Sequence, residues 1–137
     1  MSVHEFDFRV AYADTDRMGV VYYANYLVLF ERGRTEFLRS LGLRYREFEE
    51  TRKLFMPALE SHVEYYAPAR YDDLIKVRTF ISELGAAHIV FGSEIFDETG
   101  RLIAKGHVKL VVVNARWKPV RMPIDIRASL APHVASR

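Results

Sequence analysis

A polar loop near the N-terminus carries the most suggestive chemistry of this chain. Asp16 stands in the loop, and Gly19 and a short apolar run join it to an expected helix that begins near Ala24. The first N–H groups of a helix have no partner within the helix and carry a partial positive charge. They can stabilise an oxyanion that forms on a carbonyl group, and a glycine lets the backbone approach a ligand closely. A carboxylate opposite such donors suits acyl transfer when no Ser-His or Cys-His pair is present.

The same loop has a purely structural interpretation. Asp14 and Asp16 can form Asx-turns that shape the loop, and Asn25 can cap the helix. On residue types alone this interpretation is the more common one. The loop by itself therefore does not establish an activity.

The bulk composition is that of an ordinary globular chain and excludes several classes of function. The chain has 137 residues, the size of one domain spanning residues 1–137, with 50% hydrophobic and 28% charged residues. Its formal charge of +2 is too balanced to indicate nucleic-acid binding. No cysteine is present, which excludes disulfides and thiolate metal sites. No run approaches the roughly 18 apolar residues of a membrane span and no signal peptide is seen. We therefore expect no transmembrane segment and a cytoplasmic location.

Periodicity places the loop between a strand and a helix. Apolar residues alternate over 6–12, as in a half-buried strand, and recur at three- and four-residue steps over 24–41, as in a helix. A charge-rich, helix-like stretch follows at 46–52. Four further strands are expected at residues 62–66, 74–84, 87–96 and 102–114. Three hairpin-like joints between these strands predict an antiparallel meander packed against the long helix, which is an α+β architecture.

Two features of this arrangement predict an oligomer. The expected helix is apolar on most of its circumference, so the sheet must wrap it or a second subunit must cover it. The strand over 87–96 is long and apolar and contains neither proline nor lysine. As an edge strand it would invite pairing with another chain.

Two separated motifs resemble those of hotdog-fold thioesterases. Residues 12–26, with the run Phe-Glu-Arg-Gly-Arg-Thr-Glu at 30–36, closely resemble the 4-hydroxybenzoyl-CoA thioesterase family. Within that family they are most similar to the acyl-CoA thioesterases associated with the Tol-Pal system. The stretch Val-Glu-Tyr-Tyr-Ala-Pro-Ala-Arg-Tyr-Asp-Asp at 63–73 agrees with this resemblance. The resemblance covers about residues 5–125 and implies a hotdog fold, in which a curved antiparallel sheet wraps one long helix in the order β-α-β-β-β-β.

The resemblance also implies roles for residues of the loop. The catalytic second Asp of the family's Asp-x-Asp-x-x-Gly loop falls on Asp16, and the backbone N–H that polarises the thioester carbonyl falls on Tyr23. Gly19, Val21 and Tyr22 are then expected to contact the substrate. Several relatives carry His at the position of Tyr23, a departure that would change rate or acyl preference if the side chain takes part. The implied reaction is hydrolysis of an acyl-CoA thioester by an Asp nucleophile or general base, without metal or cofactor.

Partners follow from the same resemblance. Hotdog relatives form dimers with the active site at the interface, so we expect a homodimer that assembles into a homotetramer and acts on acyl-CoA. Residues 115–137 are expected to lie as a tail over the domain or a neighbouring subunit. Basic side chains can hold the phosphates of coenzyme A, although surface charge explains any single one of them better. The candidates are Arg70, Lys105, His107, Arg116, Lys118 and Arg121.

Other candidates and functions are weaker. Glu31 and Glu36 lie where another hotdog branch keeps a catalytic Glu, but ion pairs with neighbouring arginines explain them better. His62, His88 and His107 lack metal-ligand spacing. Two alternatives stay open. One is a hotdog dehydratase or hydratase, although the His and acid cluster that it would need is not seen. The other is a non-catalytic acyl-CoA-binding or envelope-associated scaffold domain.

Overall fold

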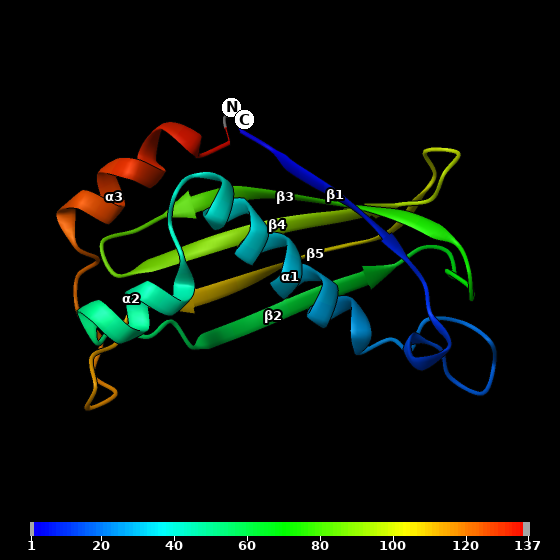
Figure 1. The fold of residues 1–137 in the computed structure, drawn as a ribbon, viewed down its shortest axis with the longest axis horizontal. Helices are drawn as coiled ribbons and strands as arrows, with labels where there is room; N and C mark the ends of the chain where they lie inside the picture. The colour runs from blue at the N-terminus through cyan, green and yellow to red at the C-terminus, as the bar shows by residue number, and fades with distance from the viewer. Residues whose placement is uncertain (1, 136–137) are drawn as a thin grey trace.

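The structure, a computed structural model, describes residues 2–135 and consists of one antiparallel sheet with helices on one face and at one end (Figure 1). The strands are β1 (His4–Arg9), β2 (Ala58–Tyr65), β3 (Leu74–Leu84), β4 (His88–Phe96) and β5 (Leu102–Val111). The helices are α1 (Asn25–Ser40), α2 (Tyr45–Arg52) and α3 (Ile124–Leu130), with short 3-10 turns η1 (Tyr12–Asp14) and η2 (Ala131–His133). The predicted α+β order of strand, long helix and four strands is confirmed. Helix α2 matches the helix-like stretch at 46–52.

The order of strands in the sheet corrects two expectations. The order is β1-β3-β4-β5-β2, so β3, β4 and β5 form a meander, but β2 pairs with β5 instead of forming a hairpin with β3. Strand β2 ends at Tyr65, shortly before Pro68, and the segment that follows crosses to the end of β1, where the amide of Val10 donates to the carbonyl of Asp73 at 2.9 Å. Strand β4, the expected edge, lies in the middle of the sheet. Its lack of proline and lysine suits a strand that pairs on both sides.

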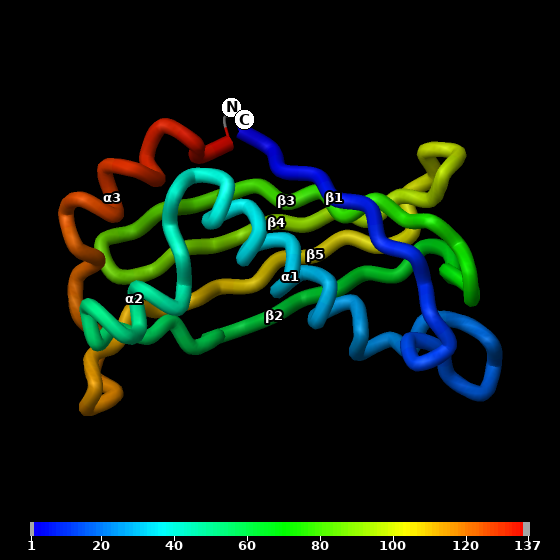
Figure 2. Tube along the Cα trace, viewed as in Figure 1, coloured from blue at the N-terminus to red at the C-terminus, as the bar shows by residue number. Residues whose placement is uncertain are grey.

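Helix α1 lies across one face of the sheet (Figures 1 and 2). The side of the helix that faces the sheet is buried. The helix comes close to the sheet at Gly33, where a Cβ atom would lie 2.3 Å from Oγ1 of the fully buried Thr79 on β3. Val28 and Arg32, on the other side of the helix, are exposed. The sheet of the single chain therefore does not wrap α1 all round, and cover by a second subunit stays a prediction. The buried residues of α1 form a stripe of Tyr26, Leu29, Phe30, Gly33, Phe37 and Leu38.

The C-terminal residues fold against the sheet and are more structured than the expected tail. Helix α3 buries Leu130, and the amide of Met122 donates to the carbonyl of Ala86 at 2.8 Å. Val134 then pairs with Ile81 of β3 in a parallel bridge. Among the described residues, no helix is both long and apolar enough to cross a membrane.

Candidate functional site

The loop between β1 and α1 turns tightly around Asp16. The amide of Asp16 donates to the carbonyl of Val20, and the amide of Gly19 donates back to the carbonyl of Asp16, both at 2.9 Å. Gly19 adopts φ +83°, a left-handed conformation that glycine reaches without strain. The amide of the buried Val21 donates to the carbonyl of Ala69 at 2.8 Å. A contact with a segment far along the chain therefore sets where this turn lies.

Asp14 holds the loop against the start of α1. Its carboxylate accepts a hydrogen bond from the amide of Ala11 at 2.7 Å. Its carbonyl accepts from the amide of Tyr22 and from the side chain of Asn25, both at 2.9 Å. Asn25 thus ties the loop to the helix instead of capping the helix. The structural interpretation of Asp14 from the sequence agrees with these contacts.

Only one of the two carboxylate oxygens of Asp16 helps to shape the loop. Its Oδ1 atom accepts from the amide of Met18 at 2.9 Å, which makes an Asx-turn. No donor from residues 2–135 reaches its second oxygen, Oδ2. The side chain is partly buried, so the carboxylate is held in place and yet open on one side.

Tyr22 and Tyr23 form the step from the loop into α1. The carbonyl of Tyr22 accepts from the amide of Asn25 at 2.8 Å, whereas the Tyr23 amide has no acceptor in the described part of the chain. A hydrogen bond with the Tyr23 side chain raises the pKa of the Tyr22 hydroxyl, and the charge of Asp16 adds a smaller effect in the same direction. The open carboxylate of Asp16 therefore lies near Tyr22, the residue before the free amide of Tyr23.

Tyr65, at the end of β2, belongs to this site and was not singled out from the sequence. Its hydroxyl donates to the carbonyl of Tyr23 at 3.0 Å. Its ring meets that of Tyr26 edge-on, with centroids 5.4 Å apart and planes at 70°. Val63, two residues earlier, packs against the core, so period-two alternation along β2 points Tyr65 to the same face as Val63. That alternation is the one signal in the sequence that could have indicated Tyr65.

The candidate basic residues are spread over the chain. Arg70 pairs with Val20 in an isolated bridge and lies beside the loop. Lys105 and His107 follow the alternation of β5 onto the sheet face opposite to α1, and the Lys105 ammonium lies 5.8 Å from the ring centroid of Tyr66. The remaining candidates lie in the exposed segment after β5, at the end of the sheet far from the loop (Figure 1). They are Arg116, Lys118 and Arg121.

Glu36 and the three histidine candidates have partners of their own. Glu36 pairs with Arg39 one turn later on α1. The rings of His62 and His107 stack across β2 and β5 with centroids 5.5 Å apart, and His88 pairs with Glu83. The ion pair of Glu36 agrees with the structural explanation that the sequence favoured for it.

Comparison with known proteins identifies the family. The model of the Thioesterase-like superfamily matches residues 10–130. The chain belongs to this superfamily. An acyl-CoA thioesterase of Haemophilus influenzae, YbgC, is 38% identical over 125 residues, which cover 90% of this chain and 91% of that protein. A putative acyl-CoA thioesterase of Bacillus subtilis, YneP, is 33% identical and covers 88% of each chain.

Solved thioesterase structures confirm the hotdog fold of this superfamily member. The crystal structure of a DHNA-CoA thioesterase from Staphylococcus aureus superposes with a TM-score of 0.91 at 28% sequence identity. The match covers 96% of this chain and 91% of the other. One long helix against a five-stranded antiparallel sheet is thus the shared architecture.

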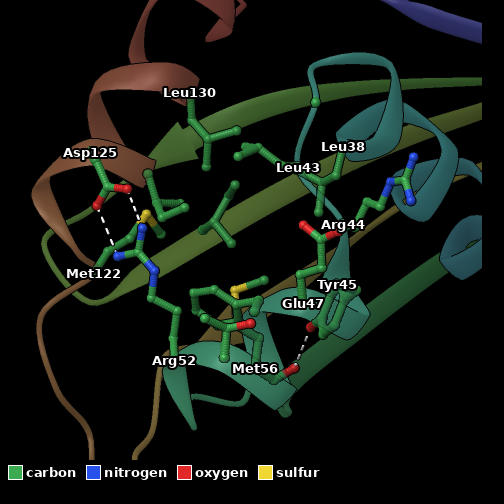
Figure 3. A pocket seen from close by; sticks show the side chains of 15 residues that line it. Leu38, Leu43, Arg44, Tyr45, Glu47, Arg52, Met56, Met122, Asp125 and Leu130 are labelled. Carbon is green, nitrogen blue, oxygen red and sulfur yellow. Dashed lines mark hydrogen bonds and ion pairs between the residues drawn. The ribbon is translucent and has the colours of Figure 1, made fainter.

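An apolar cavity of about 310 Å³ lies elsewhere in this thioesterase-superfamily chain, between the end of α1, α2 and α3 (Figure 3). On one side of it, Arg52 Nη1 donates to Asp125 Oδ1 at 2.9 Å, and on another Tyr45 donates to the carbonyl of Met56 at 3.1 Å. Because α1 separates this cavity from the loop of Asp16, the cavity is not part of the candidate site. Its apolar lining includes Leu38, Leu43, Phe48, Met56, Ile89, Met122 and Leu130.

Proposed function

We propose that this protein hydrolyses acyl-CoA thioesters, with Asp16 as the catalytic carboxylate and the Tyr23 amide as the oxyanion donor. One observation carries the proposal. The same loop presents the open Oδ2 of Asp16 and the free amide of Tyr23, just before α1. Relatives named as acyl-CoA thioesterases, at 33% and 38% identity over most of the chain, support the choice of substrate.

In the proposed reaction, water and the thioester give a carboxylic acid and the thiol of coenzyme A. Asp16 either attacks the thioester carbon and forms an anhydride that water then cleaves, or it removes a proton from the water that attacks. In both routes negative charge builds on the carbonyl oxygen, and the Tyr23 amide donates a hydrogen bond to it. The C–S bond then breaks and the thiolate leaves. Gly19, Val21 and Tyr22 would line the reacting end of the substrate.

The unpaired edge of β2 supports the proposal that the protein works as a dimer. None of the eight residues of β2 is buried, and Leu59 and Tyr65 are about half exposed or more. Within residues 2–135, no strand lies beside β2 on the side away from β5. If two subunits joined their β2 strands, each would cover the open β2 edge of the other. Because Tyr65 contacts Tyr23, this interface would lie next to the proposed site.

An antiparallel β2 pair would also bring basic residues to the site from the second subunit. Such a pair sets the first residues of one β2 opposite the last residues of the other. The start of β2 lies near the segment after β5, because Phe55 pairs with Val113. We therefore assign Arg116, Lys118 and Arg121 to the coenzyme A phosphates of the partner's site. Arg70 would act in its own subunit, and Lys105 is the least favoured candidate because it lies on the opposite face of the sheet.

Steady-state hydrolysis of a panel of acyl-CoA thioesters, followed with a free-thiol reagent, tests the proposed function. Multiple turnovers with at least one chain length are expected. Tight acyl-CoA binding without release of thiol would favour the non-catalytic binding domain instead. The Tol-Pal association, the cytoplasmic location and the tetramer stay predictions.

A further inference from the structure

Tyr65 connects the edge strand to the start of α1 through its hydroxyl group. The strand and the helix start are 42 residues apart in sequence, and the Tyr65 hydroxyl bridges them by donating to the Tyr23 carbonyl at 3.0 Å. Tyr26, against which the Tyr65 ring packs, is only 3% exposed. The Tyr65 ring therefore packs against a buried neighbour, and this contact and the hydrogen bond to Tyr23 together orient its hydroxyl.

The two peptide groups around Tyr23 are each held by one hydrogen bond. The Tyr22 carbonyl, which shares a peptide group with the Tyr23 N–H, accepts from the Asn25 amide at 2.8 Å. Hydrogen bonds in a chain polarise one another, so this contact strengthens the Tyr23 N–H as a donor. The next peptide group is fixed through the Tyr23 carbonyl by Tyr65. Removing the second contact would leave the carbonyl of Tyr23 without its hydrogen-bond donor and this peptide group less firmly oriented.

We propose that Tyr65 is a positioning residue, whose hydroxyl holds the Tyr23 backbone in the orientation that lets its amide stabilise the oxyanion. This inference rests on the proposed function. Donors fixed in advance at the site of developing charge are worth more than donors that must reorganise during the reaction. Partial burial, and secondarily the neighbouring Tyr23 side chain, raise the pKa of Tyr65, so its hydroxyl keeps its proton across the neutral range.

The test compares two substitutions that each delete one phenolic hydroxyl. Tyr65→Phe keeps the ring packed on Tyr26 and removes only the bond to Tyr23. Tyr45→Phe is the matched control, because the Tyr45 hydroxyl also donates to a backbone carbonyl, that of Met56 at 3.1 Å, but at the far end of α1. We expect kcat of Tyr65→Phe to fall about two- to tenfold, the effect of one neutral hydrogen bond, with KM nearly constant. Tyr45→Phe should keep the wild-type kcat.

A second readout separates positioning of the amide from general loosening of the site. Two inhibitors are compared, a coenzyme A ketone with a carbonyl at the position of the thioester and a thioether without it. Tyr65→Phe should weaken the ketone more than the thioether, because only the ketone oxygen can accept from the Tyr23 amide. An unchanged kcat, a rise in KM alone, or equal weakening of both inhibitors would overturn the inference.

The outcome is distinguishable from failure of the proposed function. If the wild type hydrolyses no acyl-CoA thioester, or Asp16→Asn retains full turnover, the proposed function itself is wrong. If wild type is active, Asp16→Asn is inactive and Tyr65→Phe behaves like wild type, only the role of Tyr65 is refuted.

Discussion

The carboxylates of Asp14 and Asp16 lie two residues apart in one loop but differ in what they bind. The Asp14 carboxylate accepts a hydrogen bond from the Ala11 amide at 2.7 Å. The backbone carbonyl of Asp14 accepts two more, from the Tyr22 amide and the Asn25 side chain. Asp16 uses only Oδ1, for the Met18 amide, and leaves Oδ2 open. One carboxylate is therefore placed to support the loop and the other to act on a substrate.

This difference predicts unequal effects of two matched substitutions. Asp16→Asn keeps an oxygen for the Met18 amide but removes the negative charge, so kcat should fall at least about a hundredfold with the fold intact. Asp14→Asn retains an acceptor for the Ala11 amide and should be much milder. Acyl-CoA turnover and circular dichroism of both variants check the prediction. If Asp14→Asn abolished turnover and Asp16→Asn did not, the assignment of the catalytic carboxylate would be wrong.

Binding of coenzyme A phosphates by basic side chains predicts a salt effect on KM. Raising the salt from about 0.1 M to about 1 M shortens the screening length from about 10 Å to about 3 Å and should raise KM for acyl-CoA, while kcat changes little. The same acyl group on N-acetylcysteamine, which has no phosphate, is the control and should show no such rise. A KM for acyl-CoA that stays flat over this range would count against phosphate binding by exposed cations.

The proposed dimer predicts complementation between two defective chains. One chain carries Asp16→Asn, and the other carries Arg116→Ala, Lys118→Ala and Arg121→Ala. Random exchange makes half of the dimers mixed, and a mixed dimer has one intact site if the basic residues act across the interface, so about a quarter of wild-type activity should return at low substrate. No recovery would place the basic residues in their own subunit, and a triple variant that is active by itself would place them away from the site. Light scattering that found an active monomer would refute the dimer itself.

The close crossing of α1 over β3 predicts a stability defect with a specific rescue. A Cβ atom at position 33 would meet Oγ1 of Thr79 at 2.3 Å, so Gly33→Ala should reduce the free energy of unfolding by about 1–3 kcal/mol. Thr79→Ala removes the obstructing hydroxyl, which has no hydrogen-bond partner in the described structure. The double variant should recover part of the loss in chemical denaturation. Equal stability of Gly33→Ala and wild type would show that the helix shifts without cost.

The sequence by itself determined the long helix and most of the strands, because their signals are local, although β2 begins at Ala58, four residues before the expected start at 62. The period of apolar residues predicted the helix within one residue of its observed bounds, Asn25–Ser40, and predicted β3 with its observed bounds, Leu74–Leu84. Residue types together with the family resemblance singled out Asp16, and its catalytic role stays a prediction. Helix α3 was missed because it is short and is held by contacts with distant segments, such as that of the Arg127 side chain with the carbonyl of Gly85, which no local pattern encodes.

The tertiary structure decided what depends on contacts between distant residues. The sequence placed 87–96 at an edge, yet β4 is central and β2 is open, because strand order depends on pairings such as that of Val63 with Gly106. The open oxygen of Asp16 and the contact of Tyr65 with Tyr23 likewise became visible only in the tertiary structure. Side-chain periodicity records which face of an element is apolar, whereas hydrogen-bond partners are chosen only when separate segments meet in space.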